Sequence, residues 1–243
     1  MATTSAPQRR RGRLRRGALT PDWIVTESLR LLDTAGLAGF SMPKLGRALG
    51  ADPTAVYRHF ASKDDLILAI ADRLIEEAMD GLPAHDCWVE TIIDMIRRQR
   101  RTYLAHPAAA SLSSYRTTGR PAEMRVVERV LGAVTAAGFE GYEAAVVYRA
   151  LGDFTLGFCG AEAALLALPE PLQAVDRAAW THAYRAVDNE EYPHIWRVRD
   201  ELPQVTDDDI FEAVLDIVIT GICERAPQPC TCGRHPGGSA ARD

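Results

Sequence analysis

The stretch GADPTAVYRHFASKDDL, residues 50–66, decides the fold of this 243-residue chain. Gly50 can adopt the left-handed backbone of a tight turn, and it follows a short predicted helix over 41–48. Asp52 is a good N-cap for the next helix, which is predicted over 53–60. Two short helices joined by a glycine turn predict a helix-turn-helix.

The second of these helices has two different faces. At 100° per residue Val56 and Phe60 point in the same direction, which predicts that both are buried. Thr54 and Arg58 point the opposite way, and Tyr57 lies on the flank. Arginine can form two hydrogen bonds to guanine, and threonine can bond a base or contact a thymine methyl group. The pattern therefore predicts a recognition helix that enters the major groove of DNA.

A further helix follows directly. Ser62 and Asp65 have the spacing of a capping box for a helix predicted over 63–81. This cap places Lys63 at an exposed helix N-terminus, where its ammonium group can meet a phosphate. We therefore expect residues 20–66 to form a helix-turn-helix DNA-binding domain.

The rest of the chain also reads as helical. Apolar residues recur at helical spacing, Gly and Pro stand between these segments, and alternating β-branched runs are almost absent. We therefore expect an all-α protein. The predicted helices cover residues 21–35, 41–48, 53–60, 63–81, 86–105, 107–115, 121–137, 141–167, 175–188 and 206–225.

Charge is distributed unevenly along the chain. Residues 1–63 contain 11 Lys and Arg against 4 Asp and Glu, whereas the remainder contains 17 against 29. A basic first quarter on an acidic body suits a head that approaches DNA phosphates. No apolar run reaches the roughly 18 residues that span a bilayer, and the basic N-terminus lacks the apolar segment of a signal peptide. The five cysteines are too few and too unevenly spaced for a disulfide framework. We expect a cytoplasmic protein with no membrane partner.

The N-terminal arm is rich in arginine, with six in residues 9–16. Such an arm can lie in the minor groove or along phosphates, as the arms of other helix-turn-helix proteins do. The alternative is a solvated tail that attracts DNA weakly and without specificity. We expect DNA contacts from Arg9, Arg10, Arg11, Arg13, Arg15 and Arg16.

Residues 50–66 resemble the signature of the TetR family, in which a glycine turn leads to a Tyr-x-His-Phe core and then to a lysine. The resemblance implies that Tyr57 and Lys63 contact the DNA backbone, that His59 lies at the protein–DNA boundary, and that the outer positions of the recognition helix read bases. The alternative is that Tyr57 and His59 are packing aromatics of a generic helical bundle. The candidate DNA-binding residues of this domain are Met42, Pro53, Thr54, Tyr57, Arg58, His59 and Lys63.

The second half resembles, more distantly, the C-terminal domain of the tetracycline repressor, for example at Gly119-Arg120-Pro121 and over residues 151–157. That domain is all helical, binds a small molecule and dimerises through a four-helix bundle. Here the bundle would use the helices predicted over 141–167 and 206–225, whose apolar and small residues allow close packing. The alternative is that these stripes form intramolecular core. The expected organisation is a disordered basic arm at 1–19, the DNA-binding domain at 20–66, a ligand-binding and dimerisation domain at 67–226 and a disordered tail at 227–243.

A small-molecule site is by default a largely apolar pocket with a few polar groups. Aromatic and methionine side chains at helical spacing are more often core than ligand wall, so we expect only some of the candidates to touch a ligand. The candidates are Met95, Gln99, Tyr103, Tyr115, Arg120, Pro121, Met124, Phe154, Phe158, Trp180 and Tyr184.

One departure from the tetracycline repressor concerns metal binding. In that repressor a histidine just before the Arg-Pro turn helps to hold the drug as a magnesium chelate. This chain keeps Arg120-Pro121 but has no histidine between His106 and His182. We therefore expect a mostly apolar effector that binds without a metal ion, and we expect no cofactor.

A catalytic protein is one alternative class. The chain contains no Gly-rich phosphate loop, His-Glu-x-x-His or Gly-x-Ser-x-Gly motif. Cys230, Cys232 and His235 could offer ligands to zinc, against the alternative of a solvated tail with redox-reactive thiols. A purely architectural DNA-binding protein is a further alternative class. We expect a homodimeric repressor that is not an enzyme. A small molecule is expected to release this homodimer from a palindromic double-stranded operator.

Overall fold

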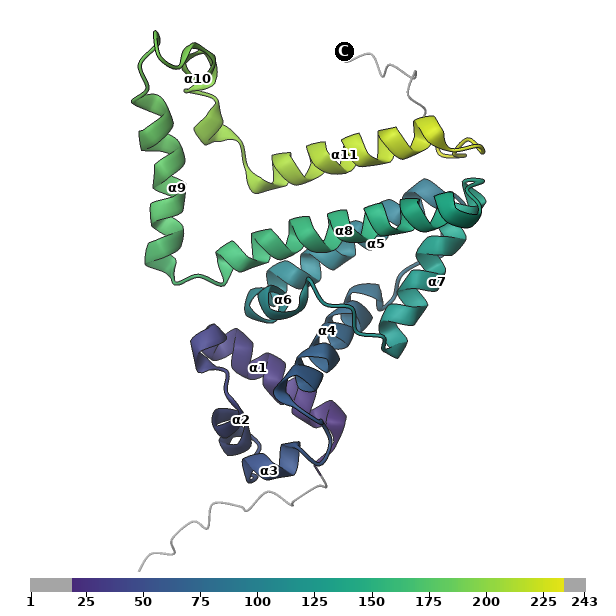
Figure 1. Cartoon of the computed structure of the whole chain (residues 1–243), viewed down its shortest axis with the longest axis vertical. Helices are drawn as coiled ribbons and strands as arrows, with labels where there is room; N and C mark the ends of the chain where they lie inside the picture. The colour runs from purple at the N-terminus through teal and green to yellow at the C-terminus, as the bar shows by residue number, and fades with distance from the viewer. Residues whose placement is uncertain (1–18, 234–243) are drawn as a thin grey trace, which may run out of the picture.

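The computed structural model describes residues 19–233, without the side chain of Trp180. This part of the chain contains helices and no strands, which confirms the all-α prediction (Figure 1). The arginines of the N-terminal arm, Arg9 to Arg16, lie outside the described residues. The elements are α1 (Pro21–Gly39), α2 (Met42–Ala48), α3 (Pro53–Val56), α4 (Lys63–Met79), α5 (Trp88–Ala105), α6 (Pro107–Ser113), α7 (Pro121–Ala136), α8 (Gly141–Leu166), α9 (Glu170–Arg185), α10 (Pro193–Val198), the 3-10 helix η1 (Leu202–Gln204) and α11 (Asp207–Arg225).

The head consists of α1, α2 and α3 packed on the first half of α4. Its core contains Ile24, Leu32, Leu45, Val56 and Phe60, all of which are buried. The inward direction predicted for Val56 and Phe60 is thus confirmed. The predicted turn and N-caps are present as well, because Gly50 has a φ of 62° and the side chains of the α1, α2 and α3 N-caps all accept backbone N–H bonds.

Two helices of the head differ from the prediction. α1 continues to Gly39 after a kink at Gly36, whose φ is 61°. α3 ends at Val56 rather than at residue 60. The backbone N–H groups of Arg58 and His59 bond carbonyls three residues back, and such bonds tighten the last turn into a non-α geometry.

The body is built around α5 and α8, which pack against each other and are flanked by α4, α6 and α7. α4 belongs to both parts, since it packs on α1 of the head and on α5, α6 and α7 of the body. α11 lies along α8 and α5, whereas α9 projects away from the body and packs mainly on α10 and η1 (Figure 1). α9 begins at Glu170 rather than at 175, because Pro171 is compatible with a first helical turn. α10 and η1 were not predicted.

The segment 226–233 lies against the body, so the expected disorder beyond Ala226 is wrong for these residues. The backbone N–H of Gln228 donates to the carbonyl of Ala137 at 2.9 Å. Pro227 and Gln228 approach the backbone of Gly138, whose φ is 89°. A side chain at this position would prevent the approach, because a Cβ would lie only 2.9 Å from Pro227. The composition of the segment, rich in Pro and Gly, gave no sign of this tertiary contact.

Within residues 19–233, no single helix is both long and apolar enough to cross a membrane. In this part of the chain, only α8 and α9 taken together, with a bend of 114° between them, have the length and the apolar composition of a membrane span.

Candidate functional site

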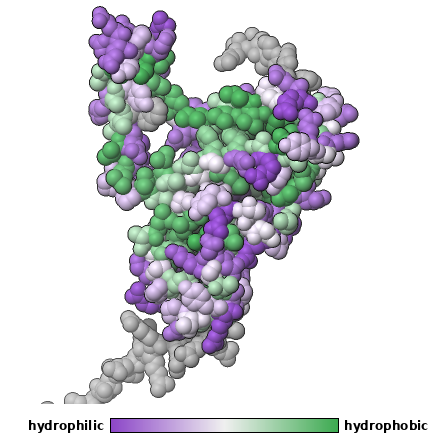
Figure 2. Space-filling model, viewed as in Figure 1, coloured by the Kyte–Doolittle hydropathy of each residue, from purple (hydrophilic) through white to green (hydrophobic). Residues whose placement is uncertain are grey.

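The tip of the head carries the exposed residues of the predicted recognition helix. Thr54, Tyr57, Arg58 and His59 are exposed between the buried anchors Val56 and Phe60, and Lys63 is exposed at the start of α4. This tip is mostly hydrophilic in Figure 2. The structure thus brings these candidates together on one surface, with only Pro53 half-buried.

Small local contacts orient two of these side chains. The backbone N–H and the hydroxyl of Thr54 both donate to Asp52 Oδ1, at 2.8 Å and 2.7 Å. These hydrogen bonds, that of the hydroxyl first, lower the pKa of Asp52. The Lys63 ammonium lies over the ring of Phe40, 5.4 Å from its centroid. Both side chains are therefore held at the surface of the tip.

Met42 does not belong to this surface. Its side chain is 8% exposed and packs in the core of the head, so the structure does not bring it to the exposed tip with the other candidates. It shares the inward face of α2 with Leu45, whereas Lys44 and Arg47 are exposed on the other face. The helical spacing of Met42, Leu45 and Leu49 could have identified the two basic residues as the surface candidates.

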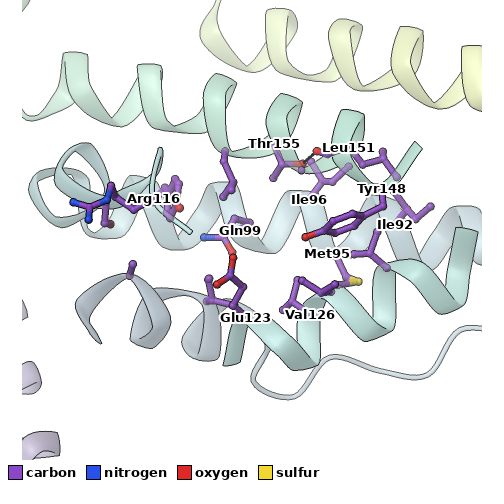
Figure 3. A pocket seen from close by; sticks show the side chains of 18 residues that line it. Ile92, Met95, Ile96, Gln99, Arg116, Glu123, Val126, Tyr148, Leu151 and Thr155 are labelled. Atoms are coloured by element: carbon purple, nitrogen blue, oxygen red, sulfur yellow. Dashed lines mark hydrogen bonds between the residues drawn. The ribbon is translucent and has the colours of Figure 1, made fainter. Parts of the chain in front are cut away.

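A cavity of about 100 Å³ lies in the body between α4, α5, α7 and α8 (Figure 3). Most of its wall is apolar. The apolar lining consists of Ala71, Ile75, Ile92, Met95, Ile96, Val126, Val127, Val130, Leu151, Gly152 and Leu156. The polar lining consists of Gln99, Tyr103, Ser113, Arg116, Glu123, Tyr148 and Thr155.

Several polar groups converge at one part of this cavity. In Figure 3 the hydroxyl of Tyr148 points toward the side chains of Gln99 and Glu123. Burial raises the pKa of Tyr148, and the Glu123 carboxylate adds to this effect. The buried Gln99 amide nitrogen has no hydrogen-bond partner within the described residues. A buried donor left without an acceptor costs about 1–3 kcal/mol, so this wall is suited to a ligand that supplies an acceptor.

Three of the candidate ligand residues line the cavity, namely Met95, Gln99 and Tyr103. Burial raises the pKa of the Tyr103 phenol. Aromatic and methionine content alone could not separate wall from surface, because this separation depends on how helices distant in the sequence face one another. Arg116, Glu123, Tyr148 and Thr155 were missed for the same reason.

The other candidates lie elsewhere. Tyr115, Pro121 and Met124 are exposed. Phe154 and Phe158 pack against each other with their rings tilted by 49° and the ring centroids 5.9 Å apart. Tyr184 and Trp180 lie on α9, which projects from the body. Among the side chains that the structure describes, those of Tyr115, Arg120, Pro121, Met124, Phe154, Phe158 and Tyr184 do not line the cavity.

The cavity wall does not fit a magnesium chelate. Glu123 is its only carboxylate and no histidine lines it. Glu123 Oε2 already accepts hydrogen bonds from the backbone and hydroxyl of Thr118, both at 2.7 Å, and from the backbone of Gly119. Among residues 19–233 there is no group of three or more His, Cys, Asp or Glu that could hold a metal ion.

Carboxylates along α4 connect the DNA-facing tip to the cavity wall. Asp64 accepts two hydrogen bonds from Arg116, at 2.6 Å and 2.7 Å, and Arg116 lines the cavity. The hydrogen bond from Arg116 lowers the pKa of Asp64. Asp65 accepts from Arg120, and Asp72 accepts from the backbone of Glu123 at 2.9 Å. The segment 116–123 is thus fastened to the helix that begins at Lys63.

A histidine joins the head to the body at a second point. His106, between α5 and α6, lies 2.9 Å from Asp33 of α1 and 3.2 Å from Glu77 of α4. Burial lowers the pKa of His106, but the hydrogen bonds and charges of Asp33 and Glu77 outweigh it, so that the pKa is raised above its ordinary value. The imidazolium form therefore bridges the two carboxylates.

This bridge predicts a pH dependence of stability. A group whose pKa is raised by folding stabilises the protein fully below its unfolded pKa, and this contribution is lost as the pH rises through the folded pKa. For His106 the loss begins above the ordinary value near 6.5. We expect the melting temperature to fall between pH 6 and pH 8, and to fall less in His106→Gln. Equal slopes in the two proteins would contradict the bridge, and His182→Gln, on exposed α9, is the control.

The outer faces of α8 and α11 carry exposed apolar side chains. Ile217 of α11 is 68% exposed, and Ile210, Val146 and Leu165 are also exposed. Figure 2 shows hydrophobic residues gathered along these helices. The apolar residues predicted to line the dimer bundle on α8 fall on two faces of the helix. Val147, Leu151 and Thr155 are buried in the body, and the other face is directed outward. No described part of the chain covers the outward faces of α8 and α11, or Leu172 and Val175 on the projecting α9.

Comparison with known families gives two matches. Residues 24–70 match the family described as bacterial regulatory proteins, tetR family. Residues 81–226 match the family described as tetracyclin repressor-like, C-terminal domain. The second match alone covers more than half of the chain, and it contains the whole of α5 to α11.

Individual proteins agree with these matches. An HTH-type transcriptional regulator of Saccharopolyspora erythraea is 33% identical over 59% of this chain and 61% of its own length. The chain thus spans about three fifths of such curated relatives. ActR of Streptomyces coelicolor, solved in complex with actinorhodin, has the same fold at 24% identity, with a TM-score of 0.74 over 86% of this chain and 98% of that chain. BioQ, solved with its double-stranded DNA operator, is 30% identical, with a TM-score of 0.54 over 61% of this chain and 88% of that chain.

Proposed function

Because this chain belongs to the TetR family of transcriptional regulators and has a tetracycline-repressor-like C-terminal domain, we propose that it is a cytoplasmic homodimeric repressor that a small molecule releases from its operator. The family is one of regulators rather than enzymes. The observation that carries the proposal is Arg116, which lines the cavity and also binds Asp64, the residue next to Lys63. One side chain therefore touches both the effector site and the helix that begins at the DNA-facing tip.

Operator recognition is assigned to the exposed tip of the head. Arg58 and Thr54 read bases in the major groove, while Tyr57, His59 and Lys63 contact the backbone or its boundary. The exposed Lys44 and Arg47 of α2 are further candidates for phosphate contacts. The BioQ complex supports the assignment, since that relative binds double-stranded DNA.

The homodimer is assigned to the outward faces of α8 and α11. A face bearing Ile217 at 68% exposure is unfavourable in water, and its burial against the same face of a second copy gives a two-fold interface. The projecting α9, with its exposed Leu172 and Val175, reaches away from its own body and would pack on the partner. Two-fold symmetry then requires a near-palindromic operator.

The effector is assigned to the cavity. Drug-sized ligands occupy roughly 300–1,000 Å³, whereas this cavity offers about 100 Å³, so binding has to move its walls apart. The mostly apolar lining and the unpartnered Gln99 amide favour an apolar molecule with a hydrogen-bond acceptor. The donor set argues against a metal chelate, and ActR supports small-molecule binding in this fold.

Coupling between the two sites is assigned to α4. A ligand that displaces Arg116 or Glu123 also pulls on Asp64 and Asp72, and so shifts α4 along with Lys63. The two recognition helices of a dimer must stand about 34–36 Å apart to enter successive major grooves. A shift of α4 changes that separation, and coupling of about 1–3 kcal/mol is typical of such switches.

The test begins with selection of bound duplexes from random DNA, followed by two substitutions on the selected operator. Arg58→Ala is expected to weaken binding by about 1–3 kcal/mol and to relax base preference at one position of each half-site. Lys63→Ala is expected to weaken all sequences alike and to reduce the slope of log affinity against log salt by about 1. Fluorescence anisotropy at several salt concentrations measures both effects.

Arg125→Ala is the matched control, because Arg125 is exposed on the body and pairs with Glu76 at 3.4 Å. It should leave the affinity and the salt slope unchanged. An equal loss on operator and random DNA for Arg58→Ala would contradict its role in base reading. Failure to select any preferred sequence would refute the proposed function itself.

A further inference from the structure

The last described segment of the chain is seated on the body beside the start of α5. Its Gln228 N–H bonds Ala137, and Pro227 packs into the space left by Gly138. Beyond these contacts, Cys230 and Cys232 are half-buried and pack against the main core. The segment therefore places Cys230 and Cys232 against the core of the body, far from their position in the sequence.

Cys87 is the residue that meets this segment. It directly precedes α5, its side chain is 3% exposed, and its thiol is in hydrogen-bonding contact with that of Cys232. No disulfide joins the cysteines within residues 19–233. A disulfide requires its two sulfur atoms to meet, and the thiols of Cys87 and Cys232 are already in contact, with Cys232 half-buried at the edge of the core.

We propose that Cys87 and Cys232 form an oxidation site, in which a hydroperoxide joins the two thiols as an intrachain disulfide. One thiolate attacks the peroxide O–O bond and becomes a sulfenic acid, while the other oxygen leaves as hydroxide and takes up a proton. The second thiol then attacks the sulfenic sulfur, and the S–S bond forms with loss of water. In total, two thiols and one hydrogen peroxide give one disulfide and two waters, with two electrons passing to the peroxide.

The local chemistry supports this pair. Burial raises the pKa of Cys87, but the Cys232 side chain and the nearby backbone N–H groups of Glu90 and Val89 outweigh it and bring the pKa to about 7. The lowered pKa favours the thiolate, which is the reactive form of a cysteine. Cys159 is the contrast, since burial and the neighbouring Glu162 raise its pKa to about 12.

The full-length protein tests the site directly, with hydrogen peroxide as the probe. After oxidation, the protein is unfolded in guanidinium chloride, so that the buried Cys87 becomes accessible. Remaining thiols are then blocked with N-ethylmaleimide, and the protein is digested without reduction. Mass spectrometry is expected to find a Cys87–Cys232 cross-linked peptide, in protein that runs as a single subunit on a non-reducing gel. Dithiothreitol should return both peptides to the thiol form.

Three variants make the result decisive. Cys232→Ser, at the half-buried position, should abolish the cross-link and leave Cys87 open to alkylation, and Cys87→Ser should abolish it as well. Cys230→Ser is the matched control in the same segment and should still form the cross-link. Thermal melts establish that each variant is folded.

Other outcomes overturn the proposal. These are a Cys230–Cys232 or Cys87–Cys230 link, a link between subunits, and peroxide treatment that leaves Cys87 fully alkylated by the maleimide. The measurement requires neither operator nor effector, so its result is independent of the proposed regulatory function.

Discussion

Replacing Arg100 with methionine is expected to lower the free energy of unfolding by about 3 kcal/mol. Arg100 of α5 and Glu162 of α8 are each 11% exposed, and their side chains form two hydrogen bonds at 2.8 Å and 2.6 Å. The guanidinium also lies 4.4 Å from the ring centroid of Phe211 in α11. Removing the cation leaves the Glu162 carboxylate buried without compensation. We place the effect at the low end of the usual 3–5 kcal/mol, because the third partner, Asp208, is exposed and water can reach that edge.

Arg97→Met is the matched control for this substitution. Arg97 also links α5 to α11, through Glu212, but this pair is 43% and 49% exposed. Exposed ion pairs contribute about 0–1 kcal/mol, so the control should lose far less stability. Urea unfolding at one fixed protein concentration measures both variants, since dissociation of a dimer would otherwise enter the result. Similar losses in the two variants would show that burial of the Arg100 pair is not what stabilises this junction.

Replacing Gly152 with leucine is expected to abolish release by effectors while leaving operator affinity within about twofold. Gly152 lines the cavity from α8, and a Cβ added to it would meet no atom within 4 Å. Because Gly152 belongs to the lining, a leucine side chain there is expected to take up part of the cavity, whose volume is only about 100 Å³. Glycine within a helix costs about 1 kcal/mol relative to alanine, so α8 itself should not be weakened.

The measurement uses a panel of one- to three-ring aromatic compounds, each titrated into the complex of wild type with labelled operator. Compounds that release the wild type are then titrated into the variant, with and without EDTA. Gly132→Leu, on the exposed side of α7, is the control and should keep the full response. A response that survives in Gly152→Leu would place the effector elsewhere, and a response lost on adding EDTA would contradict metal-free binding.

Local patterns predicted most of the secondary structure and the tip of the head. The faces of α3 follow from spacing along one helix, so the burial of Val56 and Phe60 and the exposure of Arg58 could be read from the sequence. The same rule, applied to α2, would have placed Met42 inside. Caps and glycine turns are also local, and most helix boundaries were close to the prediction.

Features that depend on contacts between distant segments could not be predicted in this way. The cavity wall combines Gln99 with Tyr148 and Glu123, which lie on three helices, and no periodicity within one helix relates them. The order of segment 226–233 depends on the absence of a side chain at Gly138, far away in the sequence. Composition describes neither relation, and it therefore assigned Met124 to a pocket and this segment to disorder.

The double role of Arg116 bears on the effector concentration that a cell needs to release the operator. If the same guanidinium serves both the effector and the contact with Asp64, then DNA-bound protein must bind the effector more weakly than free protein, by the factor that the effector weakens DNA binding. The dose that empties half of the operators therefore exceeds the dose that half-saturates free protein. Extra operator copies would raise this threshold further, so gene dosage would set the sensitivity of the response along with the affinity of the cavity.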